Sequence, residues 1–141
     1  MPYDLERFVA AQAGTYEGAL RELQAGRKTG HWMWFVFPQV AGLGQSEVSR
    51  YYAIGSVDEA RAYLDHPVLG PRLRECARAV LAVEGRSAEA ILGGIDAMKL
   101  RSSMSLFRRA APDEAVFGEV LERYYGGRPD EATDTLLTGG R

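Results

Sequence analysis

The chain has 141 residues, which is enough for a single domain spanning residues 1–141 with its own hydrophobic core. Its 17 basic and 19 acidic residues give a net charge of −2, which argues against the strongly basic face of a nucleic-acid-binding protein. The single cysteine, Cys76, cannot form an internal disulfide, and no apolar stretch approaches membrane-spanning length. We therefore expect a soluble, cytoplasmic protein without a membrane partner.

Two helices are predicted before residue 27. Leu5, Phe8 and Val9 share one helical face after Asp4, which can cap the helix. A second helix follows from Thr15 to Gly26, with apolar residues again at helical spacing. Both helices are amphipathic, which is typical of elements that pack on a core.

An aromatic stretch, His31 to Gln39, follows and contains both tryptophans of the chain, Trp32 and Trp34. Apolar residues fill every position from Trp32 to Val36, so the pattern has neither a helical nor a strand period. Flanking glycines and Pro38 favour a short buried strand or an irregular connection between helices. His31 and Gln39 border the stretch with polar groups that either satisfy the tryptophan N–H groups or meet a ligand.

The middle of the chain is predicted to be helical with one sharp interruption. Ser56-Val57-Asp58-Glu59 is a capping box and predicts a helix start. The segment from His66 to Pro71 breaks that helix, because proline lacks an amide N–H and restricts the residue before it. The next helix, beginning near Pro71, places Cys76 in its apolar stripe, which favours a buried structural thiol.

The helix from about Ile95 to Ala111 carries the most informative pattern. Lys99 and Ser103 lie one turn apart in its apolar half, so both side chains are directed inward. A buried ammonium requires an acidic partner, a water-filled pocket or an anionic ligand. The alternative is a lysine whose charge reaches solvent along the helix edge.

The last segments, near Val116–Tyr124 and after Pro129, also have helical apolar spacing. Together the patterns predict a mainly α fold, a single compact helical domain of five to seven helices around the buried aromatic stretch, with a frayed tail from about residue 138. No spaced Cys/His set or phosphate-cradling glycine motif is present, so neither a metal site nor a cofactor is predicted.

Several motifs resemble a bacterial family catalogued as domain of unknown function 1810, some members of which are labelled calpastatin. The resemblance rests on His31 to Gln39, on Tyr52-Ala53-Ile54, on Glu59 to Leu73, and on Lys99 to Phe107. It implies a mainly helical fold and supplies no established activity. The family's motifs include positions that match His31, Trp34, Pro38, Gln39, Lys99 and Ser103.

The pattern is also similar to helical N-glycosidase-like proteins that act on ADP-ribose and related ribosides. Such proteins use an acidic residue to stabilise an oxocarbenium-like centre, and Glu47 is the nearest acidic residue after the aromatic stretch. The site residues expected to bind a small anionic, nucleotide-like or ADP-ribose-like molecule are His31, Trp32, Trp34, Gln39, Lys99 and Ser103. Catalytic residues remain unassigned, as does enzymatic activity.

Two functions are compatible with these residues: binding of such a ligand, with hydrolysis of an N-glycosidic bond, or a protein-protein interaction module without catalysis. An aromatic pocket containing Lys99 favours the ligand, whereas a wide apolar patch favours a protein partner. For the chain itself we expect a monomer or a weak homodimer.

Overall fold

The computed structural model describes residues 3–138 and contains ten helices in that range. In chain order they are α1 (Glu6–Gln12), α2 (Tyr16–Gln24), α3 (Met33–Val36), α4 (Glu47–Tyr51), α5 (Val57–Asp65), α6 (Leu69–Ala82), α7 (Ala88–Leu92), α8 (Gly94–Ala110), α9 (Ala115–Tyr125) and α10 (Glu131–Thr138). The mainly α prediction is confirmed. The number of helices exceeds the predicted five to seven because α3, α4 and α7 are separate helices of only four or five residues.

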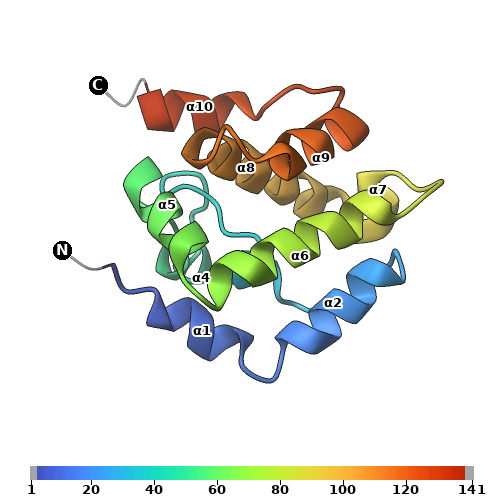
Figure 1. The fold of residues 1–141 in the computed structure, drawn as a ribbon, viewed down its shortest axis with the longest axis horizontal. Coiled ribbons are helices and arrows are strands. Elements are labelled where there is room, and N and C mark those ends of the chain that lie inside the picture. Colours follow the sequence, from blue (N-terminus) through green and yellow to red (C-terminus); the bar gives the residue numbers. More distant parts are fainter. Residues whose placement is uncertain (1–2, 139–141) are drawn as a thin grey trace.

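The helices are arranged around α6 and α8 (Figure 1). In this view α1 and α2 lie along the lower edge, α6 crosses the middle, and α8, α9 and α10 lie on the upper side. The 17-residue α8 packs against α5, α7, α9 and α10, so it is the element around which the C-terminal half is assembled. None of the helices in residues 3–138 is both long and apolar enough to cross a bilayer. The predicted frayed tail lies almost entirely outside the described residues.

The predicted capping box at the start of α5 forms in part, because Ser56 caps the helix while Glu59 reaches back to the N–H of Gly55 and not to that of Ser56. The Glu59 backbone N–H donates to Ser56 Oγ at 3.1 Å, and Glu59 Oε1 accepts from the Gly55 N–H at 2.8 Å. The Glu59 carboxylate also pairs with Arg7 at 3.2 Å. One side chain thereby stabilises the N-terminus of α5 and attaches it to α1.

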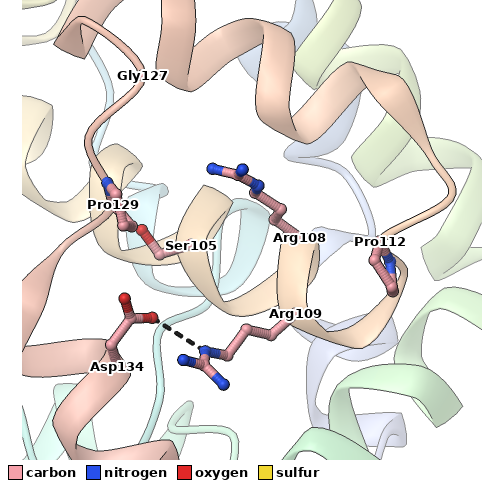
Figure 2. A pocket seen from close by; sticks show the side chains of 7 residues that line it. All are labelled: Ser105, Arg108, Arg109, Pro112, Gly127, Pro129 and Asp134. Atoms are coloured by element: carbon pink, nitrogen blue, oxygen red, sulfur yellow. Dashed lines mark hydrogen bonds and ion pairs between the residues drawn. The ribbon is translucent and has the colours of Figure 1, made fainter.

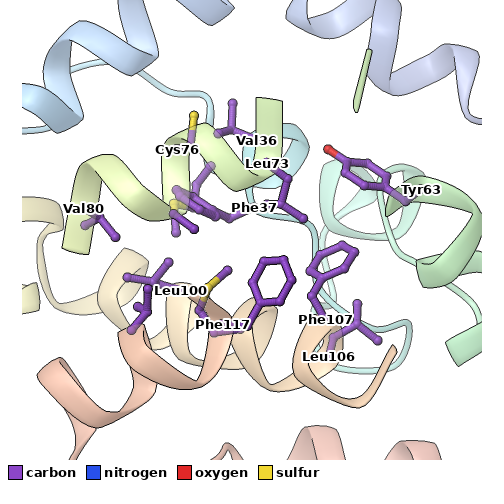
Figure 3. Packing of buried hydrophobic residues seen from close by; sticks show 14 of the residues in the cluster. Val36, Phe37, Tyr63, Leu73, Cys76, Val80, Leu100, Leu106, Phe107 and Phe117 are labelled. Carbon is purple, nitrogen blue, oxygen red and sulfur yellow. The ribbon is translucent and has the colours of Figure 1, made fainter. Parts of the chain in front are cut away.

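The core is an aromatic and aliphatic cluster between α5, α6, α8 and α9 (Figure 3). The Phe107 ring of α8 lies 5.4 Å from the Tyr63 ring and 5.9 Å from the Phe117 ring, centre to centre. Rings at these separations stabilise one another beyond the area that they bury. Trp32 and Phe37 are also buried, which confirms that the aromatic stretch belongs to the core.

The aromatic stretch itself is neither the predicted strand nor an irregular connection, because its centre forms the one-turn helix α3. Such a turn directs Met33, Val36 and Phe37 into the core and leaves Trp34 and Phe35 half-buried on the other side. After α3 the backbone becomes extended. The Ile54 N–H donates to the Gln39 carbonyl and the Ala41 N–H donates to the Ile54 carbonyl, so residues 39–41 are held beside the start of the α5 segment.

Candidate functional site

The two lysines of the chain meet at a single carboxylate. Lys28 Nζ lies 2.7 Å from Asp96 Oδ2, and Lys99 Nζ lies 3.5 Å from Asp96 Oδ1. Lys99 and Asp96 are one helical turn apart on α8, whereas Lys28 comes from the loop after α2. The side chains of Lys28, Asp96 and Lys99 are 8%, 18% and 20% exposed. We call these three residues the lysine pair cluster.

Each lysine of this cluster also contacts one of the two tryptophans. Lys28 Nζ lies 5.1 Å from the centre of the Trp32 ring, and Lys99 Nζ lies 4.5 Å from the centre of the Trp34 ring. Each cation–π contact is worth about 0.5–2 kcal/mol, depending on how far it is desolvated. The aromatic stretch therefore places both ammonium groups as well as contributing to the core.

Glu22 of α2 holds the loop that carries Lys28 and Trp32. Its Oε1 accepts hydrogen bonds from the Thr29 N–H at 2.8 Å, the Gly30 N–H at 3.0 Å and the Trp32 indole N–H at 2.9 Å. Burial opposes the charged form of Glu22, but the hydrogen bonds from Gly30, Thr29 and Trp32 outweigh it and lower the pKa of this carboxyl to about 2. A fixed carboxylate thus positions the buried tryptophan.

The lysine pair cluster has an excess of positive charge. Two ammonium groups share one carboxylate, and all three side chains are largely withdrawn from solvent. Like charges that are poorly solvated repel one another more strongly than they would in water. A further anion beside Lys99 would therefore be stabilised, because Lys28 already has the shorter contact with Asp96.

Lys99 lies on the wall of an open cleft of about 380 Å³. The cleft is formed by α8, the segment from Gln39 to Gly44, Ser49 of α4 and the start of α10. Its lining residues are Gln39, Leu43, Gly44, Ser49, Ile95, Met98, Lys99, Ser102, Asp130 and Ala132. Most of the surface is apolar, and a few polar groups point into it, which is the usual character of a small-molecule site.

The polar groups of the cleft differ in how far they are already engaged. Ser102 Oγ donates to the Met98 carbonyl at 3.2 Å. Asp130 Oδ2 accepts from the Thr133 N–H at 2.9 Å and from Thr133 Oγ1 at 2.6 Å, so it caps the start of α10. Within residues 3–138 its other oxygen, Oδ1, accepts no hydrogen bond, nor does the Gln39 side chain take part in one. These groups remain able to meet a ligand.

The sequence-predicted site residues are only partly brought together. Lys99 and Gln39 line the cleft, and Trp34 contacts the Lys99 ammonium. Trp32 is buried beside Lys28, and His31 is exposed and is not part of the cleft lining. Ser103 is fully buried, and the lining serine is its neighbour Ser102. Glu47 is exposed on α4 and does not line the cleft either.

Sequence reasoning missed Lys28, Asp96 and Asp130. For Asp96 a signal was present, because an acidic residue three positions before Lys99 on the same helix is within pairing distance. The local sequence indicates only that Lys28 is a cation near the end of α2. Its position beside α8 depends on the folding of the whole chain. Asp130 is a helix cap, as its position before α10 suggests. Its place in the cleft depends on how α10 packs on α8.

A second, larger cavity of about 490 Å³ lies between α8, α10 and the segments that precede and follow α9 (Figure 2). Its lining includes Ser105, Arg108 and Arg109 of α8 and Asp134 of α10. Figure 2 shows Arg109 reaching Asp134, and this ion pair measures 3.0 Å. Ser105 Oγ is occupied as well, since it donates to the Arg101 carbonyl and accepts from the Asp130 N–H. These contacts attach α10 to α8, so we assign this cavity a structural role.

Among residues 3–138 no three His, Cys, Asp or Glu side chains converge as a metal site would require. Cys76 is buried, and burial raises the pKa of its thiol to about 12, while a hydrogen bond with Tyr16 acts in the opposite direction. A thiol with so high a pKa is protonated at neutral pH and is a poor nucleophile.

Fold and site together define a small, mainly α domain with an apolar cleft beside a lysine pair cluster. The family model described as "Protein of unknown function (DUF1810)" matches residues 2–137, and the chain belongs to this family. It is similar to the crystal structure of the conserved hypothetical protein Rv1873 from Mycobacterium tuberculosis, with 54% sequence identity and a TM-score of 0.95. That match covers 97% of this chain and 98% of the other. No curated protein matches the chain.

Proposed function

We propose that the chain binds a small molecule that combines an anionic group with an apolar or aromatic ring, such as a nucleotide or ADP-ribose. The observation that carries this proposal is the position of Lys99, whose ammonium lies on the cleft wall while its carboxylate partner is shared with Lys28. The apolar surface of Leu43, Ile95 and Met98 would receive the ring. The volume of about 380 Å³ suits a ligand of this size.

An ammonium group suits a phosphate in particular, because lysine acts as a point charge that does not require a planar partner. Ser102 and Gln39 lie on the same cleft and offer hydroxyl and amide groups for the polar part of a riboside. The charge and the apolar wall favour a ligand that has both features over one that has either alone. Nucleoside monophosphates and ADP-ribose meet this requirement, whereas free phosphate and free base do not.

A nucleotide screen by thermal shift tests the binding proposal. AMP and ADP-ribose should raise the melting temperature of the wild type, and adenosine should raise it less. Lys99→Met should remove most of the response. Arg78→Met is the matched control, because Arg78 is an exposed cation on α6 outside the cleft lining, and it should leave the response unchanged. No response of the wild type to any of these compounds would reject the proposal.

Hydrolysis of an N-glycosidic bond is the catalytic extension of this proposal. Asp130 is the carboxylate that lines the cleft, and its Oδ1 is free of hydrogen bonds within residues 3–138. In that role Asp130 would stabilise the oxocarbenium-like centre of the ribose and orient water. Glu47 is exposed on α4 and does not line the cleft, so it cannot take this role. Chromatography that measures the release of free base from AMP or ADP-ribose tests this step. Asp130→Asn should abolish release while leaving binding measurable.

A protein-interaction module is the second candidate, supported by the outer rim of the same cleft. Ile95 and Met98 of α8 are 74% and 70% exposed, which is unusual for large apolar side chains and is typical of surfaces that become covered. Sedimentation velocity separates the two functions. If the rim serves a second copy of the chain, the wild type should dimerise and Met98→Glu should be monomeric. A monomer that responds to nucleotides favours the ligand.

A further inference from the structure

A separate cavity of about 380 Å³ lies between the first turn of α2 and α6. Gln12 at the end of α1 and Tyr16, Glu17, Gly18 and Arg21 of α2 line one side, and Arg72 of α6 lines the other. None of these residues belongs to the lysine pair cluster or to the cleft beside it. The cavity is therefore independent of the site on which the proposed function rests.

Arg72 is held in place by two contacts that leave its charge uncompensated. Its Nη1 donates to Gln12 Oε1 at 3.3 Å, and its guanidinium carbon lies 4.7 Å from the centre of the Tyr16 ring. Within residues 3–138 its side chain forms no ion pair. A half-buried guanidinium of this kind is normally paired, because its charge is poorly solvated.

The orientation of Gln12 is itself fixed by the core. This side chain is only 2% exposed, and its Nε2 donates to the Phe35 carbonyl at 2.7 Å and to the Tyr63 hydroxyl at 3.2 Å. Both amide N–H groups are thus used on the core side, so the amide oxygen must face Arg72. The buried Gln12 amide therefore orients the Arg72 guanidinium without neutralising its charge. A guanidinium held in this way is preorganised to bind an anion.

Arg74, two residues further along α6, shows the contrast. Its Nε and Nη2 donate to the two oxygens of Glu114, each at 2.7 Å, which is a complete bidentate ion pair. Arg72 has the same side chain on the same helix and lacks such a partner. Arg21, which also lines the cavity, forms no ion pair within the described residues either. The lining holds two arginines and one acidic residue, Glu17, so its own net charge is positive. The nearby Glu75 carboxylate of α6 is engaged by the Tyr16 hydroxyl, which donates to it.

Gly18 leaves space at this cavity. Apart from its chain neighbours and the backbone of its own helix, a Cβ built on Gly18 would meet no atom of the described residues within 4 Å. Its helical backbone accepts any L-residue, so a side chain at this position would enter open space without strain. The site can therefore be filled by substitution.

We infer that this cavity binds an oxyanion, the carboxylate or phosphate group of a small molecule, in bidentate contact with the Arg72 guanidinium. Arginine presents parallel N–H groups that match two oxygens of such an anion. Only one of the five N–H groups of Arg72 is used by Gln12. Arg21 would add a second positive charge at the mouth.

The test follows the arginine Nε–H signals of the full chain by NMR during titration with inorganic phosphate and, separately, with acetate. Chloride is the ionic-strength control. The Arg72 signal should shift saturably with one or both anions and should not shift with chloride. The two titrations distinguish a phosphate from a carboxylate site. A wild type in which the Arg72 signal responds to neither anion overturns the inference.

Variants make the test specific. Arg72→Lys keeps the positive charge but loses the parallel N–H groups of the guanidinium. The affinity for the anion, measured from the Arg21 Nε–H signal, should therefore fall about tenfold. Arg78→Lys is the matched control on the same helix and should bind as the wild type does. Glu17→Gln should tighten binding, and Gly18→Leu should abolish it without lowering the melting temperature. Unchanged affinity in Arg72→Lys or in folded Gly18→Leu overturns the assignment.

Discussion

The Lys99 ammonium lies 4.5 Å from the centre of the Trp34 ring, and its contact with Asp96, at 3.5 Å, is longer than the contact between Lys28 and the same carboxylate. Lys28 is therefore the main partner of Asp96. Its Nζ also donates to the Gly30 carbonyl, which fixes its position further. Lys99 is the member of the cluster that remains available to a ligand in the cleft.

The two lysines should differ in their effect on stability. Lys99→Met should change the free energy of unfolding by about 1 kcal/mol or less, because Asp96 keeps Lys28, the partly exposed ion pair is worth little, and a methionine side chain can still pack on Trp34. Lys28→Met should cost about 2–3 kcal/mol, since it removes the short ion pair and the hydrogen bond to Gly30. Urea denaturation of both variants measures this difference. Equal costs would contradict the assignment of Asp96 to Lys28.

Ser103 should tolerate loss of its hydroxyl. Ser103 Oγ is fully buried and has no hydrogen-bond partner within residues 3–138. Because an unpaired buried hydroxyl is costly, Ser103→Ala should leave stability unchanged or raise it by about 1 kcal/mol. Ser105→Ala is the control, since it removes the acceptor of the Asp130 N–H and should be destabilising. A destabilised Ser103→Ala would mean that the hydroxyl has a partner.

Glu22 should make stability depend on pH. Its pKa of about 2 in the folded protein lies below the ordinary 4.5, so the charged form is favoured by folding. The contribution of Glu22 to the free energy of unfolding is complete above about pH 4.5 and is lost as the pH falls toward 2. Glu22→Gln should therefore be less stable than the wild type by roughly 1–2 kcal/mol at pH 6. In urea denaturation the difference should narrow by pH 3, and a constant difference would contradict this role.

Gly70 should be required for the packing of α6 on α5. A Cβ at this position would lie 2.1 Å from the Leu64 carbonyl oxygen, a backbone atom that cannot turn aside. Gly70→Ala should therefore lower stability by about 1–3 kcal/mol, as overpacking does. Gly18→Ala is the matched helical control, because its Cβ meets open space, and it should raise stability by up to about 1 kcal/mol. Thermal unfolding of both variants would reveal opposite shifts, and shifts of the same sign would refute the packing argument.

Local pattern was sufficient to predict the longest elements. The helix predicted from about Ile95 to Ala111 is observed as α8, Gly94–Ala110, because the segment is long and has glycines at its start. The start of α5 was predicted from the Ser56 capping box, which involves only residues within one turn. Ser46 and Ser87 likewise accept a hydrogen bond from the N–H three residues on.

Tertiary placement was not predictable from the same patterns. The run from Trp32 to Val36 is apolar at every position, so it carried no period from which the turn of α3 could be recognised. The helical wheel predicted that Lys99 is directed inward, but it did not predict which residues lie beside Lys99. Lys28, Trp34 and Asp130 approach α8 from three other segments, and only the packing of the chain brings them to it.

The Lys99 ammonium should bind the anionic group of a ligand in the cleft. Titration calorimetry of AMP and adenosine against wild type and Lys99→Met tests it as a double-mutant cycle, because one change removes the phosphate and the other the ammonium. The wild type should bind AMP at least about tenfold more tightly than adenosine, a difference of about 1.4 kcal/mol, and Lys99→Met should bind both equally. A preference for AMP that persists in Lys99→Met, or the absence of binding to the wild type, would contradict it.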